Sequence, residues 1–488
     1  MHERTATLSG NLPAMLRALE SLDADLAEVR LDSLWPEPPR EGDAIEALLA
    51  LTDAATVPLL ATLRPKRQGG AYEGPEDIRL NLLAAAAKAG FAEVDLEADL
   101  AELAGVSRIL RDDARITVSD HGMPAAPSRD AGVRELQAMQ DLHTHRQKIA
   151  YPSGSFLDEL RALELCFAHA ERNGEPAIAP MGTSPAFRAL LPLAGNQRTY
   201  AHVGAEAFPG QPSLADLEAT WKHWGLEHDE LGGRDGWYAV LGDPVEHSLS
   251  PRIHNAALRH AGRTPRYGAL RVPDSIGAVR LLTGVATRIG LRGASVTMPL
   301  KHHAAQACDG DASVQAIGAA NCFRFDDPNQ KAPATNTDAS ALRRLLEGAQ
   351  HVAVIGAGGA GRAALWAAKQ VGADTTLVAR PGDRADRAAT DFDVPAVWSA
   401  RDRIEADAWV QATPLGMHGE ASPVARVEGI EQAIELVYAA GPTGFEALAQ
   451  SAGAKVTDGR TFLIEQAVDA YHFWTGDAPE RSVMEAVL

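Results

Sequence analysis

Residues 351–365 read His351-Val-Ala-Val-Ile-Gly-Ala-Gly-Gly-Ala-Gly-Arg-Ala-Ala-Leu365 and begin with an apolar run that is typical of a buried strand. Gly356, Gly358 and Gly361 follow with the G-x-G-x-x-G spacing, directly before a helix-forming run. Glycines at this spacing allow a tight turn and a close approach of the backbone to a pyrophosphate at a helix N-terminus. The stretch therefore predicts a Rossmann lobe that binds a dinucleotide, with a purely structural glycine-rich turn as the alternative.

The end of the following strand indicates which dinucleotide is bound. Leu377-Val-Ala-Arg380 ends about 20 residues beyond the glycines, where an NAD site carries an acidic residue for the ribose 2′-hydroxyl. This chain has Ala379 and Arg380 there, with Arg384 close behind. Because basic groups suit a 2′-phosphate, the pattern predicts NADP(H) as the cofactor. The glycine-rich turn would bind it through Gly356, Ala357, Gly358, Gly359, Ala360 and Gly361.

Composition limits the possible partners and compartment. The 488 residues are enough for two or three domains, and the net charge of −19 argues against nucleic acid or an anionic membrane as a partner. Cys166, Cys308 and Cys322 form no C-x-x-C pair, which favours a reducing cytoplasm over a disulfide framework or a zinc site. The N-terminus lacks the apolar stretch of a signal peptide, and no run reaches the ~18 apolar residues of a membrane span. We therefore expect a cytoplasmic protein without a metal.

The first 210 residues alternate short strand-like runs with helical ones. The expected strands are Thr5–Leu8, Leu26–Leu31, Pro58–Leu63, Ala92–Leu96, Arg115–Ser119, Lys148–Tyr151, Ala177–Ala179 and Tyr200–Val203. Eight strands alternating with helices over about 200 residues predict an α/β fold of the (β/α)8 TIM-barrel type, with an open doubly wound sheet as the alternative. We place the barrel at 1–220, a polar linker at 221–235, a second lobe at 236–345 that is completed by about 465–488, and the Rossmann lobe at 346–464.

Polar residues recur near the ends of the expected barrel strands. They are Glu28, Arg30, Arg64, His121, Lys148, Arg188 and Gln211. Catalytic groups of such barrels gather at the C-terminal ends of several strands, so this recurrence favours an active site over a set of solvated strand ends. Neighbouring cations and partial burial lower the pKa of a lysine and give the free amine that attacks a ketone.

At these residues the chain resembles the type I 3-dehydroquinate dehydratases. The matching segments are Glu28-Val-Arg30-Leu-Asp32, Thr62-Leu-Arg64, Gly69-Gly70, Glu93-Val-Asp95-Leu-Glu97, Ser119-Asp-His121, Lys148-Ile-Ala150, Met181-Gly182 and Pro209-Gly-Gln211. The resemblance implies that Lys148 forms a Schiff base with the substrate ketone. It also implies that His121 removes the proton next to the iminium and later protonates the departing hydroxyl. By the same resemblance, Glu28, Arg30 and Arg64 hold substrate hydroxyls, while Arg188 and Gln211 hold the substrate carboxylate.

Two residues depart from that family's pattern. The family has a glutamate just before Gly69-Gly70, and this chain has Gln68. Because that glutamate would orient the histidine and raise its pKa, a neutral amide should leave His121 less basic. A serine expected shortly before Pro209-Gly-Gln211 is Ala207, which removes one hydrogen bond to the substrate.

A second polar cluster lies between the linker and the glycine-rich turn. It comprises Ser248, Ser250, Thr297, Lys301, Asn321 and Asp338. Hydroxyls and an amide suit a polyhydroxylated acid, and Lys301 with Asp338 could be the proton-handling pair that reduction of a ketone needs. Helix capping by the serines and a surface position for Lys301 are the alternatives.

In combination these motifs resemble the shikimate dehydrogenases, over residues 237–488. The resemblance implies that Lys301 and Asp338 are catalytic. It implies substrate contacts for Ser248, Ser250, Thr297, Asn321, Asp338, Tyr438 and Gln466. It adds Thr413, in Gln411-Ala-Thr413-Pro-Leu-Gly-Met417, and Gly459 to the cofactor-binding residues. This chain departs from the pattern with Gln411 for asparagine and Ala440 for proline.

Two consecutive steps of the shikimate pathway on one chain are the function we predict. The barrel would dehydrate 3-dehydroquinate, and the second half would reduce 3-dehydroshikimate to shikimate with NADPH. One alternative keeps the reductase and makes the barrel a degenerate binding module, which Gln68 favours. Another is a catabolic quinate or shikimate dehydrogenase that uses NAD, against which Arg380 and Arg384 argue. The expected partners are small-molecule substrates alone, and the sequence gives no oligomeric state.

Overall fold

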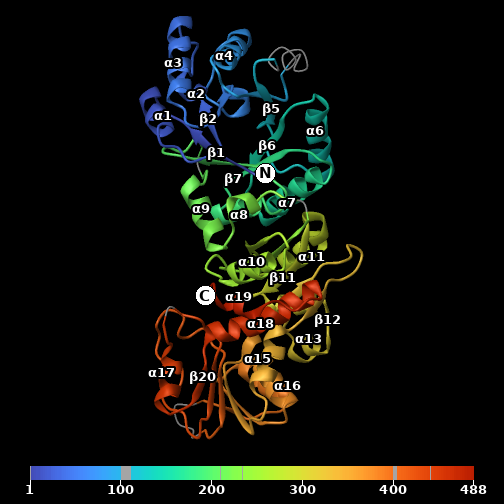
Figure 1. Cartoon of the computed structure of the whole chain (residues 1–488). Coiled ribbons are helices and arrows are strands. Elements are labelled where there is room, and N and C mark those ends of the chain that lie inside the picture. The colour runs from blue at the N-terminus through green and yellow to red at the C-terminus, as the bar shows by residue number, and fades with distance from the viewer. Residues whose placement is uncertain (1, 101–111, 209, 234, 399–403, 440) are drawn as a thin grey trace. The chain divides into compact units, whose positions relative to one another are not determined.

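The computed structural model describes residues 2–100, 112–208, 210–233, 235–398, 404–439 and 441–488 (Figure 1). Pro209 and Ala440, both named in the motifs above, lie outside the described residues. Backbone contacts divide the chain into two compact units. The first runs up to Trp237 and also includes Gly268–Leu270 and Val285–Leu291, and the second comprises Tyr238–Tyr267, Arg271–Gly284 and Arg292–Leu488.

The first unit is built on one sheet of eight parallel strands. They are β1 (Glu3–Leu8), β2 (Leu26–Arg30), β3 (Leu59–Thr62), β4 (Glu93–Glu97), β5 (Arg115–Asp120), β6 (Arg146–Pro152), β7 (Pro176–Met181) and β8 (Arg198–His202). Their order in space is β7-β6-β5-β4-β3-β2-β1-β8, so consecutive strands are neighbours and β8 lies beside β1. This strand order is that of a (β/α)8 barrel, because in a doubly wound sheet the order of the strands reverses at a switch point. The predicted barrel is confirmed, and each expected strand overlaps an observed one.

Helices connect the strands and cover the outside of the barrel (Figure 1). They are α1 (Leu12–Leu19), α2 (Leu31–Leu34), α3 (Glu41–Ala54), α4 (Glu76–Lys88), α6 (Arg129–Asp141), α7 (Phe156–Ala170), α8 (Pro185–Leu190) and α9 (Leu214–His223). Helix α9 extends three residues into the segment that we expected to be linker. The reason is packing: Trp221 is buried and its indole N–H donates to the carbonyl of Ala189 at 3.0 Å.

The barrel interior is filled by layers of inward-facing side chains. At the N-terminal ends of the strands, Arg198 bonds to Glu93 at 2.7 Å and to Glu3 at 2.7 Å. Above this ionic layer lies an apolar one, formed by Leu26, Leu60, Ala177 and Tyr200. A second ionic layer, described below, follows at the C-terminal ends. Because side chains alternate along a strand, residues two apart on one strand contribute to successive layers.

Side-chain hydrogen bonds of Asn196 join β7 to β8, the two strands at the ends of the ladder order. Its Oδ1 accepts from the backbone N–H of Ile178 at 2.8 Å, and its Nδ2 donates to the carbonyl of Arg198 at 2.7 Å. The backbone N–H of Gln197 also donates to the carbonyl of Pro176 at 2.9 Å. The fully buried amide of Asn196 therefore takes the place of ladder hydrogen bonds at this seam.

Next along the chain is a mixed six-stranded sheet of order β10-β9-β11-β13-β14-β12, which belongs to the second unit except for Trp237, Gly268–Leu270 and Leu291. Its strands are β9 (Trp237–Gly242), β10 (Tyr267–Arg271), β11 (Leu291–Val296), β12 (Asp309–Gly310), β13 (Cys322–Arg324) and β14 (Pro333–Thr335). Its helices are α10 (Ser250–His260), α11 (Ile276–Val285), α12 (Lys301–Ala307), α13 (Ala312–Ile317) and α14 (Thr337–Leu345).

The remainder is a doubly wound lobe with a parallel sheet of order β17-β16-β15-β18-β19-β20. The strands are β15 (His351–Ile355), β16 (Asp374–Val378), β17 (Ala396–Val397), β18 (Ala408–Gln411), β19 (Gln432–Glu435) and β20 (Lys455–Thr457). The helices of this lobe are α15 (Gly359–Gln370), α16 (Asp383–Phe392) and α17 (Gly444–Ser451). Helices α18 (Gly459–Thr475) and α19 (Arg481–Glu485) follow β20, and their apolar side chains pack against α10 of the preceding lobe. The strand order reverses at β15, where ligands of such sheets bind, and the predicted Rossmann lobe is confirmed.

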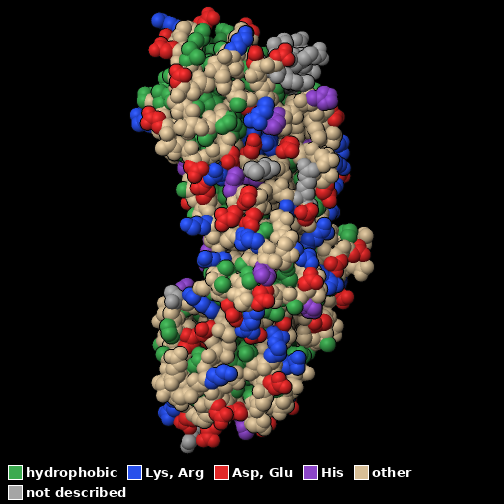
Figure 2. All heavy atoms as spheres, viewed as in Figure 1, with side chains coloured by type: hydrophobic (Ala, Val, Ile, Leu, Met, Phe, Trp, Pro, Cys, Tyr) green, Lys and Arg blue, Asp and Glu red, His purple; other side chains and the backbone are tan. Residues whose placement is uncertain are grey.

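The visible surface carries both signs of charge. Figure 2 shows acidic and basic side chains interspersed over the face in view, although the sequence as a whole carries a net charge of −19. Among the described residues, no helix has both the length and the apolar character needed to cross a bilayer.

We expect Asn196→Ala to lower the free energy of unfolding of the first unit by about 2–4 kcal/mol, because it leaves the Ile178 N–H and the Arg198 carbonyl buried without a partner. Denaturant titration followed by tryptophan fluorescence measures the loss. Asn81→Ala, on the exposed face of α4, is the matched control and should change stability little. Equal stability of the two variants would refute a structural role for Asn196 at the seam.

Candidate active sites

Lys148 lies in the upper ionic layer of the barrel, as the third residue of β6. Its side chain is 5% exposed, and its Nζ is 3.4 Å from Glu28 Oε1 and 3.7 Å from Asp95 Oδ2. The ring centroid of Tyr200 is 3.7 Å from Nζ. Burial lowers the pKa of the Lys148 amine, and Arg64 and Arg30 act in the same direction against Glu28 and Asp95. This is the environment of an amine that loses its proton more easily than a surface lysine.

Arg64 links the acidic residues around that amine. It follows the end of β3, and its guanidinium donates to Asp95 at 2.8 Å, to Glu97 at 2.9 Å and to the hydroxyl of Ser119 at 2.7 Å. With all of these groups buried, each charge is compensated by an opposite one. Arg64 is thereby held rigidly beside Lys148.

Glu28 is the second fixed carboxylate of the layer. The hydroxyls of Thr7 and Thr62 donate to it at 2.9 and 3.0 Å. Burial would raise its pKa, but Lys148, Arg30 and Arg64 outweigh that effect and lower the pKa to about 2. Glu28 is therefore ionised and can accept hydrogen bonds at neutral pH.

Two further residues expected at the site join this network. Gln211 donates to the hydroxyl of Thr7 at 3.1 Å, so it connects to Glu28 through one side chain. Arg30 makes a two-pronged ion pair with Asp32, at 2.9 and 2.8 Å. Arg30 lowers the pKa of the nearby His121, which places its positive charge within reach of the site.

Arg188 lies in a different arrangement from the one that the sequence suggests. It is 2% exposed, and its guanidinium donates to the carbonyls of Pro180 at 2.9 Å and Tyr200 at 3.2 Å. These carbonyls belong to β7 and β8, so Arg188 closes the same seam as Asn196, nearer the C-terminal ends of the strands. Its Nε is buried and has no hydrogen-bond partner among the described residues, so not every donor of the guanidinium is committed to these two acceptors.

His121 follows β5 and is held through its backbone. Its amide N–H donates to Oε1 of Gln68 at 2.6 Å, while the Gln68 amide also donates to Asp99. The ring Nδ1 is buried and has no hydrogen-bond partner among the described residues. Burial, followed by the charges of Arg64, Lys148 and Arg30, lowers the pKa of His121 well below its usual value. The ring is therefore neutral at physiological pH, as a general base must be.

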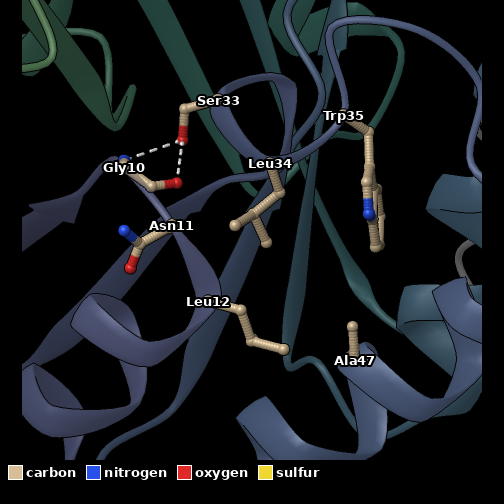
Figure 3. A pocket seen from close by; sticks show the side chains of 7 residues that line it. All are labelled: Gly10, Asn11, Leu12, Ser33, Leu34, Trp35 and Ala47. Carbon is tan, nitrogen blue, oxygen red and sulfur yellow. Dashed lines mark hydrogen bonds between the residues drawn. The ribbon is translucent and has the colours of Figure 1, made fainter.

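A cavity of about 280 Å³ opens beside the loops that follow β1 and β2 (Figure 3). Its lining residues are Gly10, Asn11, Leu12, Ser33, Leu34, Trp35 and Ala47. Figure 3 shows the hydroxyl of Ser33 held between the N–H and the carbonyl of Gly10. The cavity includes none of the residues expected at the active site.

In the second unit, Lys301 and Asp338 form a direct ion pair. Lys301 is the first residue of α12 and Asp338 the second of α14, and Nζ is 2.6 Å from Oδ2. Asp338 is buried, whereas the Lys301 side chain is 15% exposed. A lysine that is accessible on one side and oriented by a buried carboxylate can exchange a proton with a ligand.

The other polar residues of this cluster converge in pairs. Asn321 and Gln466 both contact Thr337, at 3.0 and 3.3 Å from its hydroxyl. The side chain of Ser248 makes a hydrogen bond with Tyr438, which lies just beyond β19. The Oγ of Ser248 also accepts a hydrogen bond from the backbone N–H of Ser250 at 3.3 Å. Thr297, directly after β11, packs against Gly242, where a Cβ would lie 2.6 Å from its methyl group. Together with Asp338, the predicted substrate contacts thus come from six segments of the second unit.

The glycine-rich turn has the shape that a pyrophosphate requires. Gly356 has a φ of +107°, and a Cβ on Gly361 would lie 2.0 Å from the Gly356 carbonyl. A Cβ on Gly358, the N-cap of α15, would meet nothing within 4 Å, so this backbone is open to a ligand. Arg380 and Arg384 are exposed, and among the described residues neither is in an ion pair. These residues fit an NADP-type dinucleotide.

Gly359 brings the turn into contact with the Lys301 side chain. A Cβ at Gly359 would lie 3.3 Å from Cβ and 3.4 Å from Cδ of Lys301. The first turn of α15 and the stem of Lys301 therefore pack closely, and a larger residue at position 359 would require the lysine stem to shift by a few tenths of an ångström. Gly459, the first residue of α18, is equally restricted. A Cβ on Gly459 would lie 1.9 Å from the carbonyl of Val437, so α18 begins in close contact with a neighbouring backbone segment.

Gln411 organises the loop that follows β18. Its Oε1 accepts from the N–H and the hydroxyl of Thr413, at 2.6 and 2.8 Å, and its Nε2 donates to the carbonyl of Leu415 at 2.8 Å. Thr413 in turn faces Gly356, where a Cβ would lie 2.9 Å from its methyl group. The fully buried Gln411 therefore sets the loop beside the dinucleotide turn, a role that its place in the motif did not reveal.

Several functional residues were missed by sequence reasoning. Thr7, Asp95 and Ser119 complete the ionic layer, and Thr337 joins the second cluster. Strand alternation would have found the first three, because each lies on the same face of its strand as residues of the layers below. Thr337 is adjacent to Asp338 in the sequence, and no further feature of the sequence identified it as a site residue.

Both parts of the chain are similar to known protein families. Residues 7–226 match the family model of type I 3-dehydroquinase, and residues 240–323 match that of the shikimate dehydrogenase substrate binding domain. A shikimate dehydrogenase (NADP(+)) of an Anaeromyxobacter species is 34% identical over 278 residues, which are 53% of this chain and 97% of that protein.

Two solved structures are also similar. Shikimate 5-dehydrogenase of Thermus thermophilus, in complex with NADP(H) and shikimate, is 33% identical, with a TM-score of 0.47, over 51% of this chain and 97% of its own. The dehydroquinate dehydratase and shikimate dehydrogenase from S. pombe AroM is 20% identical, with a TM-score of 0.41, over 100% of this chain and 98% of its own.

We expect Gln68→Glu to raise the pKa of His121, because a carboxylate at this position adds an attraction for the imidazolium that the amide lacks. NMR titration of ring-labelled histidine measures it. In the unchanged protein His121 should stay neutral well below pH 6.5, so its protonation and the accompanying loss of stability should appear only as the pH falls below that value. Gln350→Glu, exposed in the second unit, is the control and should leave the titration unchanged. An unmoved His121 resonance in Gln68→Glu would contradict the argument.

Proposed function

We propose that the sites around Lys148 and Lys301 catalyse two consecutive reactions. The premise is that the second half of this chain belongs to the shikimate dehydrogenase family and that the first half carries a type I 3-dehydroquinase domain. The first converts 3-dehydroquinate to 3-dehydroshikimate, and the second reduces 3-dehydroshikimate to shikimate. The observation that carries the proposal is the pairing, on one chain, of a buried lysine of lowered pKa with a lysine–aspartate pair beside a dinucleotide turn.

In the barrel, Lys148 acts as the nucleophile. Its amine adds to the substrate ketone, and loss of the carbonyl oxygen as water leaves an iminium on Nζ. The neutral His121 ring takes the proton from the adjacent carbon and returns it to the hydroxyl that departs as a second water. Hydrolysis of the product iminium then consumes one water, releases 3-dehydroshikimate as the ketone and frees the Lys148 amine, so the net reaction loses one water. Glu28, Arg64 and Gln211 are fixed by the hydrogen bonds described above, and we assign them to holding the substrate while the bonds change.

Arg30 and Arg188 complete the proposed substrate contacts. Arg30 places a positive charge near Lys148, although two of its N–H groups donate to Asp32. Arg188 donates to two backbone carbonyls, and its Nε has no hydrogen-bond partner among the described residues, so N–H donors remain for the substrate carboxylate. We therefore assign it both to the seam and to the carboxylate.

In the second unit, Lys301 and Asp338 handle the proton. When bound, NADPH supplies the hydride that reduces the carbonyl of 3-dehydroshikimate. Lys301, oriented by Asp338 at 2.6 Å, donates a proton to the carbonyl oxygen as negative charge develops there. Ser248, Asn321 and Gln466 lie in hydrogen-bonded pairs that suit the hydroxyls and carboxylate of such a substrate.

The cofactor is NADP(H) in the shikimate dehydrogenase relative, and we assign the same cofactor here. The glycine turn holds the pyrophosphate at the N-terminus of α15, and Thr413 lies beside the turn. Ala379 leaves room where an acidic residue would repel a 2′-phosphate, and the exposed Arg380 and Arg384 attract it. In an NAD-dependent dehydrogenase these two arginines would have no 2′-phosphate to bind.

A degenerate barrel without activity is disfavoured by the same observations. A binding module has no need for a buried amine enclosed by Glu28, Asp95 and Arg64, an arrangement that is costly unless every charge is compensated. We also place the protein in the cytoplasm, where its three buried free cysteines would stay reduced.

We expect substitution of each lysine to abolish or reduce only one of the two activities. Borohydride added during turnover of 3-dehydroquinate should fix substrate mass on the peptide that contains Lys148, and Lys148→Ala should abolish both labelling and dehydration. Lys301→Ala should instead lower reduction of 3-dehydroshikimate by about 10²–10⁴-fold and spare dehydration. Mass spectrometry and separate assays of each step measure these outcomes, with the exposed Lys222→Ala as the control. Dehydration that persists without labelling of Lys148 would exclude the covalent mechanism.

We expect NADPH to be strongly preferred to NADH. Arg380→Ala should raise the KM for NADPH roughly tenfold, because an exposed charge-assisted contact lies at the lower end of about 1.5–3 kcal/mol. The KM for NADH should hardly change. Arg426→Ala, a highly exposed arginine of the same unit, is the matched control. Equal losses with both cofactors would argue against a 2′-phosphate contact.

A further inference from the structure

Tyr200 lies directly against the reactive amine, yet nothing above gives it a role in the reaction. It is the central residue of β8, is 4% exposed, and contributes its ring to the apolar layer below the active site. Lys148 Nζ is 3.7 Å from the ring centroid, so the amine sits over the electron-rich face. No other aromatic ring of the described residues makes such a contact with a lysine.

The ring is fixed from the opposite side by the lower ionic layer. Arg198 Nη1 donates to the Tyr200 hydroxyl at 3.3 Å, while the same guanidinium is held by Glu93 and Glu3. Arg198 is fully buried, and its guanidinium carbon lies 5.9 Å from the ring centroid. Tyr200 therefore connects the structural ion layer to the catalytic one.

The charge balance of the covalent step explains why a π face at this position is useful. The net step joins the ammonium of Lys148 to the ketone, forms the N–C bond, and releases one water, so the positive charge remains on nitrogen. Glu28 at 3.4 Å, Asp95 at 3.7 Å and the Tyr200 ring surround that nitrogen. Groups that hold the ammonium will also hold the iminium, because its nitrogen keeps the same place and charge.

We propose that Tyr200 is a further catalytic residue of the barrel, whose ring face keeps the Schiff base on Lys148 in its protonated, cationic form. A neutral imine draws electrons weakly and would leave the adjacent C–H too little acidified for His121 to deprotonate. The two carboxylates alone could hold a cation, but each also accepts protons. The ring offers negative potential without a site for a proton. This inference rests on the Schiff-base function proposed above.

The test varies the π electrons of residue 200 while keeping its shape. Phenylalanine, 4-fluorophenylalanine and 3,4,5-trifluorophenylalanine are placed at position 200, and the rate of borohydride trapping of 3-dehydroquinate on Lys148 is measured with kcat and KM. We expect both rates to fall stepwise with fluorination and KM to stay constant. Tyr200→Leu, which removes the ring, should lose about 5- to 30-fold in both rates, the range that a desolvated cation–π contact supports.

The controls separate this role from packing. The same fluorinated series at Tyr151, a fully buried tyrosine of β6 whose hydroxyl donates to the carbonyl of Asp158, should show no graded loss. Reduction of 3-dehydroshikimate by the second unit should be unchanged in every variant, and circular dichroism reports whether each one is folded.

The possible results distinguish the inference from the function on which it rests. Trapping on Lys148 in the unchanged protein together with a flat series at position 200 would overturn the inference alone. A loss in the phenylalanine variant as large as in Tyr200→Leu would do the same, because the ring would then matter only through its hydroxyl. No trapping in the unchanged protein would overturn the Schiff-base function itself.

Discussion

Every charge inside the barrel must be compensated by an opposite charge or, for Arg188, by backbone carbonyls, because an unpaired ion in a water-poor interior costs several kcal/mol. The barrel meets this constraint with two ionic layers separated by an apolar one. Arg198 pairs with the acids of the lower layer, and Arg64, Lys148 and Arg79 together pair with the three acids of the upper layer. The position of the reactive amine is thus fixed by electrostatic pairing between strands, and the loops above the strands do not have to provide it.

The two reactive lysines of the chain illustrate how burial selects chemistry. Lys148 is almost fully enclosed, which lowers its pKa and makes the neutral amine available as a nucleophile. Lys301 remains accessible and is paired with one buried carboxylate, the situation of a group that carries a proton to a ligand and recovers it. In the function that we propose, the same type of side chain therefore serves as a covalent catalyst in one unit and as a proton donor in the other.

The sequence was sufficient for the eight barrel strands, the glycine turn and the pairing of Lys301 with Asp338, because these depend on local periodicity and on motifs of fixed spacing. It failed where a residue's partner is distant in the chain. Asn196 and Arg188 bond to backbone groups of β7 and β8, and a backbone acceptor leaves no trace in the amino-acid pattern. For Gln68 the family pattern did point to His121, but it did not indicate that the hydrogen bond comes from the backbone N–H of His121. Gln411 was noted only as a departure from the family pattern, although its partner Thr413 is just two residues away. Trp221 was assigned to a linker because its neighbours are polar, although its ring packs into the first unit.

The contact between Gly359 and the stem of Lys301 has a consequence for how this chain can evolve. The arginines at positions 380 and 384, which we assign to the 2′-phosphate, are exposed, so mutations there can alter the preferred dinucleotide while leaving the proton donor in place. Position 359 has less freedom, since a side chain there would press against Lys301 unless that stem shifts by a few tenths of an ångström. In the proposed site, cofactor choice is therefore separable from the proton donor at positions 380 and 384 and coupled to it at position 359. A protein engineer or a diverging lineage can change the first two positions in small steps, whereas a larger residue at position 359 requires an adjustment of Lys301.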